Sequence, residues 1–133
     1  MKAVRLGFLG VRTKRVAETT AFFRDVVGLA AVETRETWTM TQLPTGRWDF
    51  VEVFGDDFHD ERMIREEIDG VFVAIVVEDI EEARRDCLAA EVEILGETIW
   101  ADKAFGNPDV SGFAWFFVRA PDGNIYVFQQ VPD

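Results

Sequence analysis

The two halves of this sequence show the same order of secondary-structure signals, and this repetition restricts the possible folds more than any other feature. Each half predicts a strand, a helix and three further strands. A turn precedes the last strand in both halves, as Pro44-Thr45-Gly46 and as Pro121-Asp122-Gly123. Repetition of this kind indicates a duplicated supersecondary unit. We therefore predict an α+β fold of two βαβββ modules in tandem, 1–55 and 70–133, joined by an acidic linker at 56–69 within a single domain, 1–133.

The first module is predicted from its hydrophobic periodicity. The helix is expected at 15–27, ending at Gly28, and apolar residues at helical spacing mark its buried stripe. That stripe would consist of Val16, Thr20, Phe23 and Val27. Alternating or β-branched runs predict strands at 4–13, 30–34, 37–43 and 47–54.

The second module contains a strand that is apolar on both faces, 71–77, followed by a helix for which Asp79 is the expected N-cap. The apolar stripe of that helix would consist of Ile80, Ala83, Cys87 and Leu88. Further strands are expected at 91–99, 113–119 and 125–130. The polar segment 100–111 is predicted to be a loop, either a cover that orders over a ligand or an ordinary connection.

Composition narrows the functional classes. The chain has 133 residues and a net charge of −11, which argues against binding to nucleic acid or to an anionic membrane surface. No apolar run approaches the roughly 20 residues of a membrane helix, and a cytoplasmic protein is expected. Cys87 is the single cysteine and is expected to be a small buried hydrophobe. His59 lies in the acidic linker and is either a solvated residue or a ligand or base.

The strand at 47–54 carries the most informative polar residue of the chain, Glu52. Side chains alternate across a strand, so Trp48, Phe50 and Phe54 would share the face of Glu52. A carboxylate among aromatic rings is costly to bury unless it is paired, bound or protonated. The alternative is that Glu52 lies on a half-exposed strand and is simply solvated.

Four segments of the chain resemble the vicinal oxygen chelate superfamily, which includes glyoxalase I, bleomycin resistance proteins and extradiol dioxygenases. The segments are Ala21 to Leu29, Asp49 to Gly55, Val77 to Ala83 and Arg119 to Val127. The resemblance implies paired βαβββ modules whose mixed, curled sheets enclose a cleft, and it implies a homodimer.

Enzymes of this superfamily place up to four metal ligands on the first and last strands of each module. The resemblance places these positions at Phe8, Glu52, Phe72 and Val127, and only Glu52 has a side chain that could bind a metal. A metal site normally needs about three protein ligands, so no metal and no other cofactor is expected. Arg12 shares the face of Phe8 and is a candidate internal partner for Glu52.

Two functions follow as hypotheses. The first is a metal-free binding protein for a small organic ligand, for which a flat cationic aromatic molecule would suit the acidic chain and aromatic cleft. The second is a lyase, isomerase or dioxygenase that either uses Glu52 as a base without metal or carries a metal through ligands not identified in the sequence. A scaffold role has no support beyond tryptophans that could lie at the surface. The expected ligand-binding residues are Phe8, Arg12, Trp38, Trp48, Phe50, Glu52, Phe54, Phe72 and Val127.

Overall fold

The computed structural model describes residues 1–35, 37–42, 48–56, 68 and 70–132. Most of the predicted linker, with His59, lies outside the described residues. The chain forms two compact units. The N-terminal unit consists of Gly7–Asp60 and Arg65–Val73, and the C-terminal unit consists of Met1–Leu6, Glu61–Ile64 and Ala74–Asp133. Strands β1 (Ala3–Arg12) and β5 (Val71–Val77) each contribute residues to both units.

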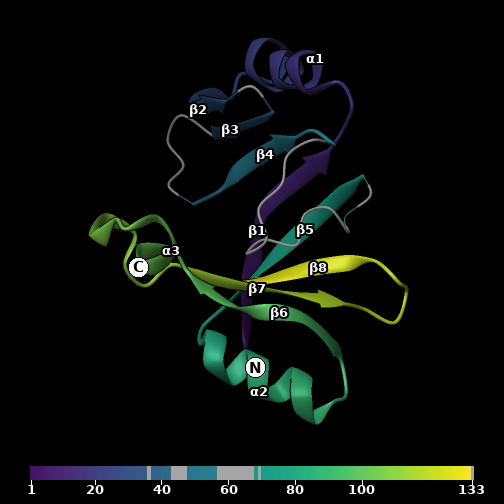
Figure 1. Cartoon of the computed structure of the whole chain (residues 1–133), viewed down its shortest axis with the longest axis vertical. Helices are drawn as coiled ribbons and strands as arrows, with labels where there is room; N and C mark the ends of the chain where they lie inside the picture. Colours follow the sequence, from purple (N-terminus) through teal and green to yellow (C-terminus); the bar gives the residue numbers. More distant parts are fainter. Residues whose placement is uncertain (36, 43–47, 57–67, 69, 133) are drawn as a thin grey trace. The chain divides into compact units, whose positions relative to one another are not determined.

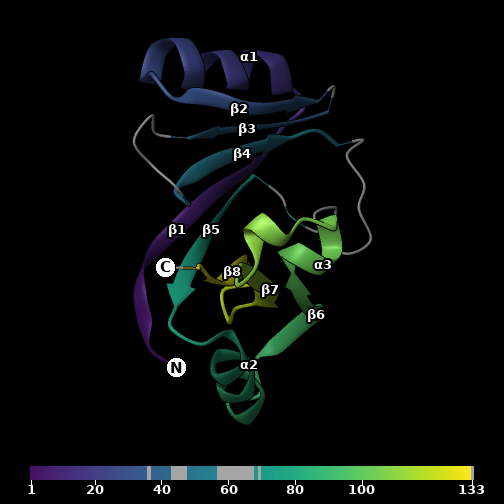
Figure 2. The same cartoon turned by 90° about the vertical axis from the view of Figure 1, so that its left-hand side faces the viewer.

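Four strands of the N-terminal unit lie in the order β2-β3-β4-β1 (Figure 1). Strands β2 (Ala30–Arg35), β3 (Trp38–Gln42) and β4 (Phe50–Phe54) are antiparallel neighbours, and β1 pairs in parallel with β4. Helix α1 (Val16–Ala21) packs against β3 and β4 (Figure 2). The hydroxyls of Thr20 and Thr39 are 2.7 Å apart, which shows that this sheet face is the one beneath the helix.

The predicted helix at 15–27 is present, but its second half has a different winding. α1 continues directly into η1 (Phe22–Val27), a π-helix. The stripe prediction was wrong at its end, because Val27 is 51% exposed whereas Thr20 is buried. A π-helix has more residues per turn than an α-helix, so the 3.6-residue period no longer identifies the buried side. Gly28, with a φ of 91°, ends the segment as predicted.

The C-terminal unit has the strand order β5-β8-β7-β6 (Figure 1). Its other strands are β6 (Glu93–Trp100), β7 (Ala114–Arg119) and β8 (Ile125–Gln130), and β5 pairs in parallel with β8. Helix α2 (Ile80–Ala89) covers one face of these strands. The core beneath it contains Ile80, Ala83, Cys87, Phe116 and Val118. The predicted burial of Cys87 is confirmed.

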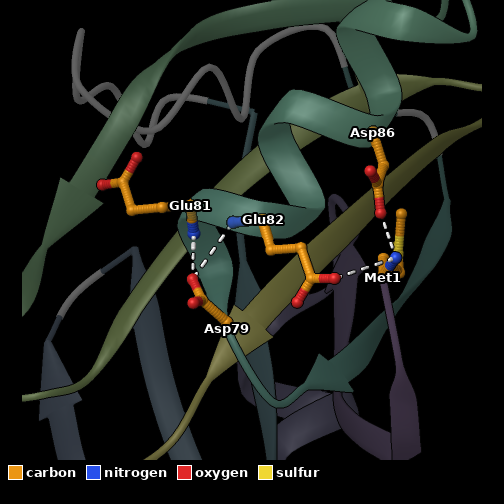
Figure 3. Close-up of polar contacts among 5 residues, drawn as sticks. All are labelled: Met1, Asp79, Glu81, Glu82 and Asp86. Atoms are coloured by element: carbon orange, nitrogen blue, oxygen red, sulfur yellow. Dashed lines mark hydrogen bonds and ion pairs between the residues drawn. The ribbon is translucent and has the colours of Figure 1, made fainter.

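Helix α2 begins at the predicted N-cap. The Asp79 carboxylate accepts hydrogen bonds from the backbone N–H groups of Glu81 and Glu82 (Figure 3), which satisfies two of the donors that a helix start leaves unpaired. The Glu82 side chain contacts the amino group of Met1, as does Asp86 one turn further along. The stripe prediction was wrong at Leu88, which is 60% exposed, because the position after Cys87 is rotated by about 100° away from the core.

The segment predicted as a polar loop, 100–111, is largely helical, and that prediction was wrong. β6 extends to Trp100, α3 (Ala101–Phe105) follows it at once, and the 3₁₀ turn η3 (Pro108–Val110) comes after Gly106. The polar composition concealed apolar anchors, because Ala101 is buried and Phe105 contacts Trp115. The predicted α+β class and the strand–helix–strand order of both modules are confirmed. Within the described residues, no helix is long and apolar enough to cross a membrane.

Candidate functional site

Glu52 lies on the face of the N-terminal sheet opposite α1. Thr39 and Thr41 pair in register with Val53 and Val51, and these four residues form the helix-covered face. Strand alternation puts Glu52 on the other face, between Phe50 and Phe54 along β4. Its cross-strand neighbours are Gly10 on β1 and Met40 on β3. The predicted face shared by Phe50, Glu52 and Phe54 is therefore present.

Four phenylalanine rings gather on this face, and we call them the phenylalanine cluster: Phe8, Phe50, Phe54 and Phe72. Phe8 stacks on Phe50 with ring centroids 4.7 Å apart and an interplanar angle of 7°. Phe72 meets Phe8 edge to face at 5.8 Å and lies 6.2 Å from Phe54. Three strands of one unit, β1, β4 and β5, supply these rings. Geometries of this kind stabilise aromatic pairs beyond their buried area.

Gly10 makes this arrangement possible. A Cβ atom built on Gly10 would lie 1.9 Å from Cε1 of Phe72, so the Phe72 ring occupies the space that any other side chain would need. Gly10 is the register partner of Glu52. The absence of a side chain at position 10 therefore lets an aromatic ring lie beside the carboxylate-bearing residue. Sequence reasoning missed Gly10, although a glycine inside a strand is itself a signal of close approach.

Glu52 is only 3% exposed, and three of the rings that share its face are also buried: Phe8 (4%), Phe54 (0%) and Phe72 (3%). The expectation of a simply solvated strand residue is thus wrong. Removing a carboxylate from water costs several kcal/mol unless charge or hydrogen bonds compensate it. The position of Glu52 thus combines near-complete burial with an aromatic lining.

Arg12, the candidate internal partner of Glu52, contacts Asp56, Ile68 and Gly70 of the same unit. Its Nε donates to the Asp56 carboxylate at 3.2 Å, and its Nη1 donates to the backbone carbonyl of Ile68 at 3.1 Å. The backbone N–H of Arg12 also donates to the Gly70 carbonyl. These contacts give Arg12 a structural role at the end of β1, where it holds the start and end of the 56–70 connection.

The remaining predicted site residues are placed differently. Trp38 is buried and is the register partner of Phe54, so it adjoins the cluster. Trp48 does not lie on β4, which begins only at Phe50, and its expected place in the alternation is wrong. The backbone N–H of Trp48 donates to the Asp49 carboxylate, a local bond that competes with strand pairing. Val127 is fully buried in the C-terminal unit.

A cavity of about 340 Å³ lies in the C-terminal unit, beneath the end of α2. Its lining is apolar and includes Cys87, Val118 and Phe128. Burial raises the pKa of the Cys87 thiol, with the neighbouring Asp86 adding to the effect. The thiol is therefore held in its protonated, less nucleophilic form. Asp86 and Tyr126 also line the cavity, although most of its surface is apolar.

The residues present do not fit a metal of the kind that the family resemblance implies. Phe8 and Phe72 have no donor atoms, and Val127 has none either. In the part of the chain that is described, no group of three or more His, Cys, Asp or Glu side chains is arranged to hold a metal ion.

Comparison with known proteins supports the fold. No protein-family model matches the sequence, and no curated protein matches it. Among solved structures, a glyoxalase/bleomycin resistance protein/dioxygenase superfamily member from Vibrio splendidus is 19% identical, with a TM-score of 0.60 over 94% of this chain and 98% of that one. Methylmalonyl-CoA epimerase from Mycobacterium tuberculosis is 13% identical, with a TM-score of 0.66 over 98% and 90%.

A larger enzyme contains the same fold as one of its parts. Homoprotocatechuate 2,3-dioxygenase from Brevibacterium fuscum is 14% identical, with a TM-score of 0.71 over 98% of this chain but 37% of its own. Identities this low establish the architecture and leave the chemistry open. The chain has the fold of the vicinal oxygen chelate superfamily, as the sequence resemblance predicted.

Proposed function

Since the chain has the vicinal oxygen chelate fold, we propose that it is a metal-free small-molecule binding protein, with Glu52 and the phenylalanine cluster as its binding site. The observation that carries this proposal is the 3% exposure of Glu52 on a face whose neighbouring side chains are phenyl rings. A buried carboxylate favours a cation, and phenyl faces attract cations as well. The ligand class that satisfies both is an organic cation, with a flat aromatic part suited to stacking.

The chemistry of the site supports binding more directly than turnover. The family resemblance places metal-ligand positions at Phe8 and Phe72, whose side chains offer no donor atoms for Lewis-acid activation. The net charge of −11 adds a long-range attraction for cations.

A proton-transfer enzyme is the second candidate. The fold match to an epimerase favours it, because epimerisation needs a positioned base and Glu52 is a buried carboxylate. In that case Glu52 would remove a proton from a carbon acid, and binding would not require a positive charge on the ligand. The two candidates therefore differ in whether ligand charge matters.

Phenyltrimethylammonium and its neutral isostere tert-butylbenzene test the proposal, because they share a shape and differ in charge. We expect the cation to bind more tightly by at least about tenfold, or about 1.4 kcal/mol. Glu52→Gln keeps the side-chain shape and should abolish that preference. Thermal melts of Glu52→Gln serve as the folding control, and Phe8→Leu should weaken both probes together.

Equal affinity for the two probes in the wild-type protein would contradict the cation-binding proposal. So would a Glu52→Gln variant that folds and still prefers the cation. Loss of hydrogen–deuterium exchange at a carbon acid in Glu52→Gln, without any charge preference in binding, would favour the proton-transfer candidate.

A further inference from the structure

Within the described residues, two buried polar side chains on neighbouring strands of the C-terminal unit lack hydrogen-bond partners. In the described part of the chain, neither the Oε1 nor the Nε2 atom of Gln129 has a partner, and the same holds for Nε1 of Trp115. Gln129 is 0% exposed and Trp115 is 4% exposed. Native proteins pair the great majority of their buried polar groups, and each exception calls for an explanation.

The two side chains are direct neighbours. Gln129 on β8 and Trp115 on β7 are register partners in an antiparallel pair, so their side chains lie on the same face of the sheet. That face is the one away from α2, because the alternate residues Ala114 and Phe116 form the core beneath the helix. An amide and an indole N–H thus adjoin each other on an otherwise apolar face, beside Phe117 and Val127.

In contrast to Gln129, the next residue along the chain, Gln130, has a side chain that is fully used in structural hydrogen bonds. The Oε1 atom of Gln130 accepts from the backbone N–H of Ile80 at 3.0 Å, and its Nε2 donates to the Gly112 carbonyl at 3.2 Å. Gln130 therefore ties the start of α2 to the segment before β7. Gln129 has no comparable structural bonds to account for its amide.

Aromatic rings flank the indole of Trp115. Phe113 meets it at a centroid distance of 5.3 Å and an angle of 65°, and Phe105 of α3 stacks on it at 6.2 Å. Phe105 is 54% exposed. Since Gln129 is fully buried, a ligand reaches it only if a covering group moves. The five-residue helix α3, which ends at Gly106 with a φ of 64°, carries the ring that we expect to move.

The chemistry of the pair selects a ligand class. The Gln129 amide offers a donor and an acceptor side by side, and the Trp115 indole adds a second donor. A carboxylate would add a buried charge and leave the Gln129 carbonyl without a donor, whereas a cation such as a quaternary ammonium makes no use of the two N–H groups. An uncharged carboxamide or lactam matches all three, because its carbonyl accepts from both donors and its N–H donates to Gln129.

We propose that Gln129 and Trp115 form a recognition site in the C-terminal unit for an uncharged carboxamide or lactam group of a small ligand. The site shares no residue with the Glu52 site, so this proposal is independent of the proposed cation binding. Gln129 acts as the two-point partner of the amide, and Trp115 adds a donor and an aromatic edge.

Nuclear magnetic resonance of ¹⁵N-labelled protein observes both groups directly, through the side-chain NH₂ of Gln129 and the indole N–H of Trp115. Benzamide is the probe, and benzoate and acetophenone are its matched controls, the first charged and the second without a donor. We expect benzamide to shift both resonances in a saturable way. The two controls should bind at least about tenfold more weakly.

Two variants complete the test. Gln129→Met keeps the length of the side chain, removes the amide, and should weaken benzamide binding at least about tenfold without lowering the melting temperature. Gln130→Met should lower the melting temperature and leave benzamide affinity unchanged. Unshifted Gln129 and Trp115 resonances at the solubility limit of benzamide would overturn the proposal, as would unchanged benzamide affinity in Gln129→Met. The wild-type titration decides the matter even if a variant does not fold.

Discussion

Gly10 is the residue on which the phenylalanine cluster depends most directly. Its missing side chain leaves room for the ring of Phe72, whose Cε1 would lie 1.9 Å from a Cβ atom there. Phe72 is 3% exposed and contacts both Phe8 and Phe54, so it has little freedom to move aside. We expect Gly10→Ala to lower the free energy of unfolding by about 1–3 kcal/mol, the usual cost of overpacking a core. Urea denaturation of both proteins measures this change in the free energy of unfolding.

The matched control for Gly10→Ala is the same change in a Phe72→Leu background. Leucine is shorter than phenylalanine and does not reach over Gly10 with a ring, so the alanine should cost less there. The coupling between the two sites should be at least about 0.5 kcal/mol, as for residues in contact. Additive effects of the two substitutions would mean that the Gly10–Phe72 contact does not decide the cost.

At the scale of elements, the start of α2 depends on one side chain. The Asp79 carboxylate accepts from the N–H groups of Glu81 and Glu82 at 2.9 and 3.0 Å. Asp79→Ala should lower the free energy of unfolding by about 0.5–2 kcal/mol, the range for loss of an N-cap. Asp79→Ser retains a capping oxygen and should recover most of the loss in chemical denaturation. A serine variant as unstable as the alanine variant would contradict the capping role.

The turn between β7 and β8 contains a carboxylate, Asp122, that should make the stability of the protein depend on pH. Hydrogen bonds from the Asn124 backbone N–H, first, and from the Tyr126 hydroxyl lower the pKa of Asp122 from its ordinary 3.8. A lowered folded pKa contributes stability that is present above the ordinary value and is lost as pH falls through the folded value. Asp122→Asn keeps an acceptor without the charge. Its melting temperature should therefore fall less than that of the wild type between about pH 5 and pH 2. Equal falls would contradict this role.

Elements were predictable where one periodicity governed the whole segment. The apolar run 71–77 and the capped helix at Asp79 were predicted because alternation and capping chemistry are local. The π-helical end at 22–27 was not, since the pattern contains nothing that distinguishes a wider turn from an α-helix. α3 was missed because Asp102 and Lys103 follow its first anchor, Ala101, and because its second anchor, Phe105, finds its partner, Trp115, in another strand.

For the whole molecule, the duplication was enough to predict the fold, because repeated element order and repeated turns leave few architectures open. Strand alternation also predicted the face that Phe50 and Glu52 share, and the family resemblance added Phe8 to it. What the sequence could not supply was cross-strand register, which depends on partners far apart in the chain. Register places Gly10 beside Glu52 and Trp115 beside Gln129, and neither pairing can be derived from local patterns.

The same register gives a prediction about metals. Glu52 has Gly10 as its strand neighbour, Phe72 lies over Gly10, and Phe8 contacts Phe72, so the three positions 8, 52 and 72 converge within one unit. As the chain stands, elemental analysis should find no stoichiometric Zn, Ni, Fe or Mn, because Phe8 and Phe72 have no lone pairs to offer.

A Phe8→His/Phe72→His variant would add two imidazoles to the Glu52 carboxylate and complete a three-ligand set. We expect that variant to bind Zn²⁺ in calorimetry with a stoichiometry of about one, and to lose it when Glu52→Gln is added. Stoichiometric metal in the unaltered protein would contradict the first prediction. A histidine variant that folds but does not bind Zn²⁺ would show that positions 8, 52 and 72 do not converge as a ligand set.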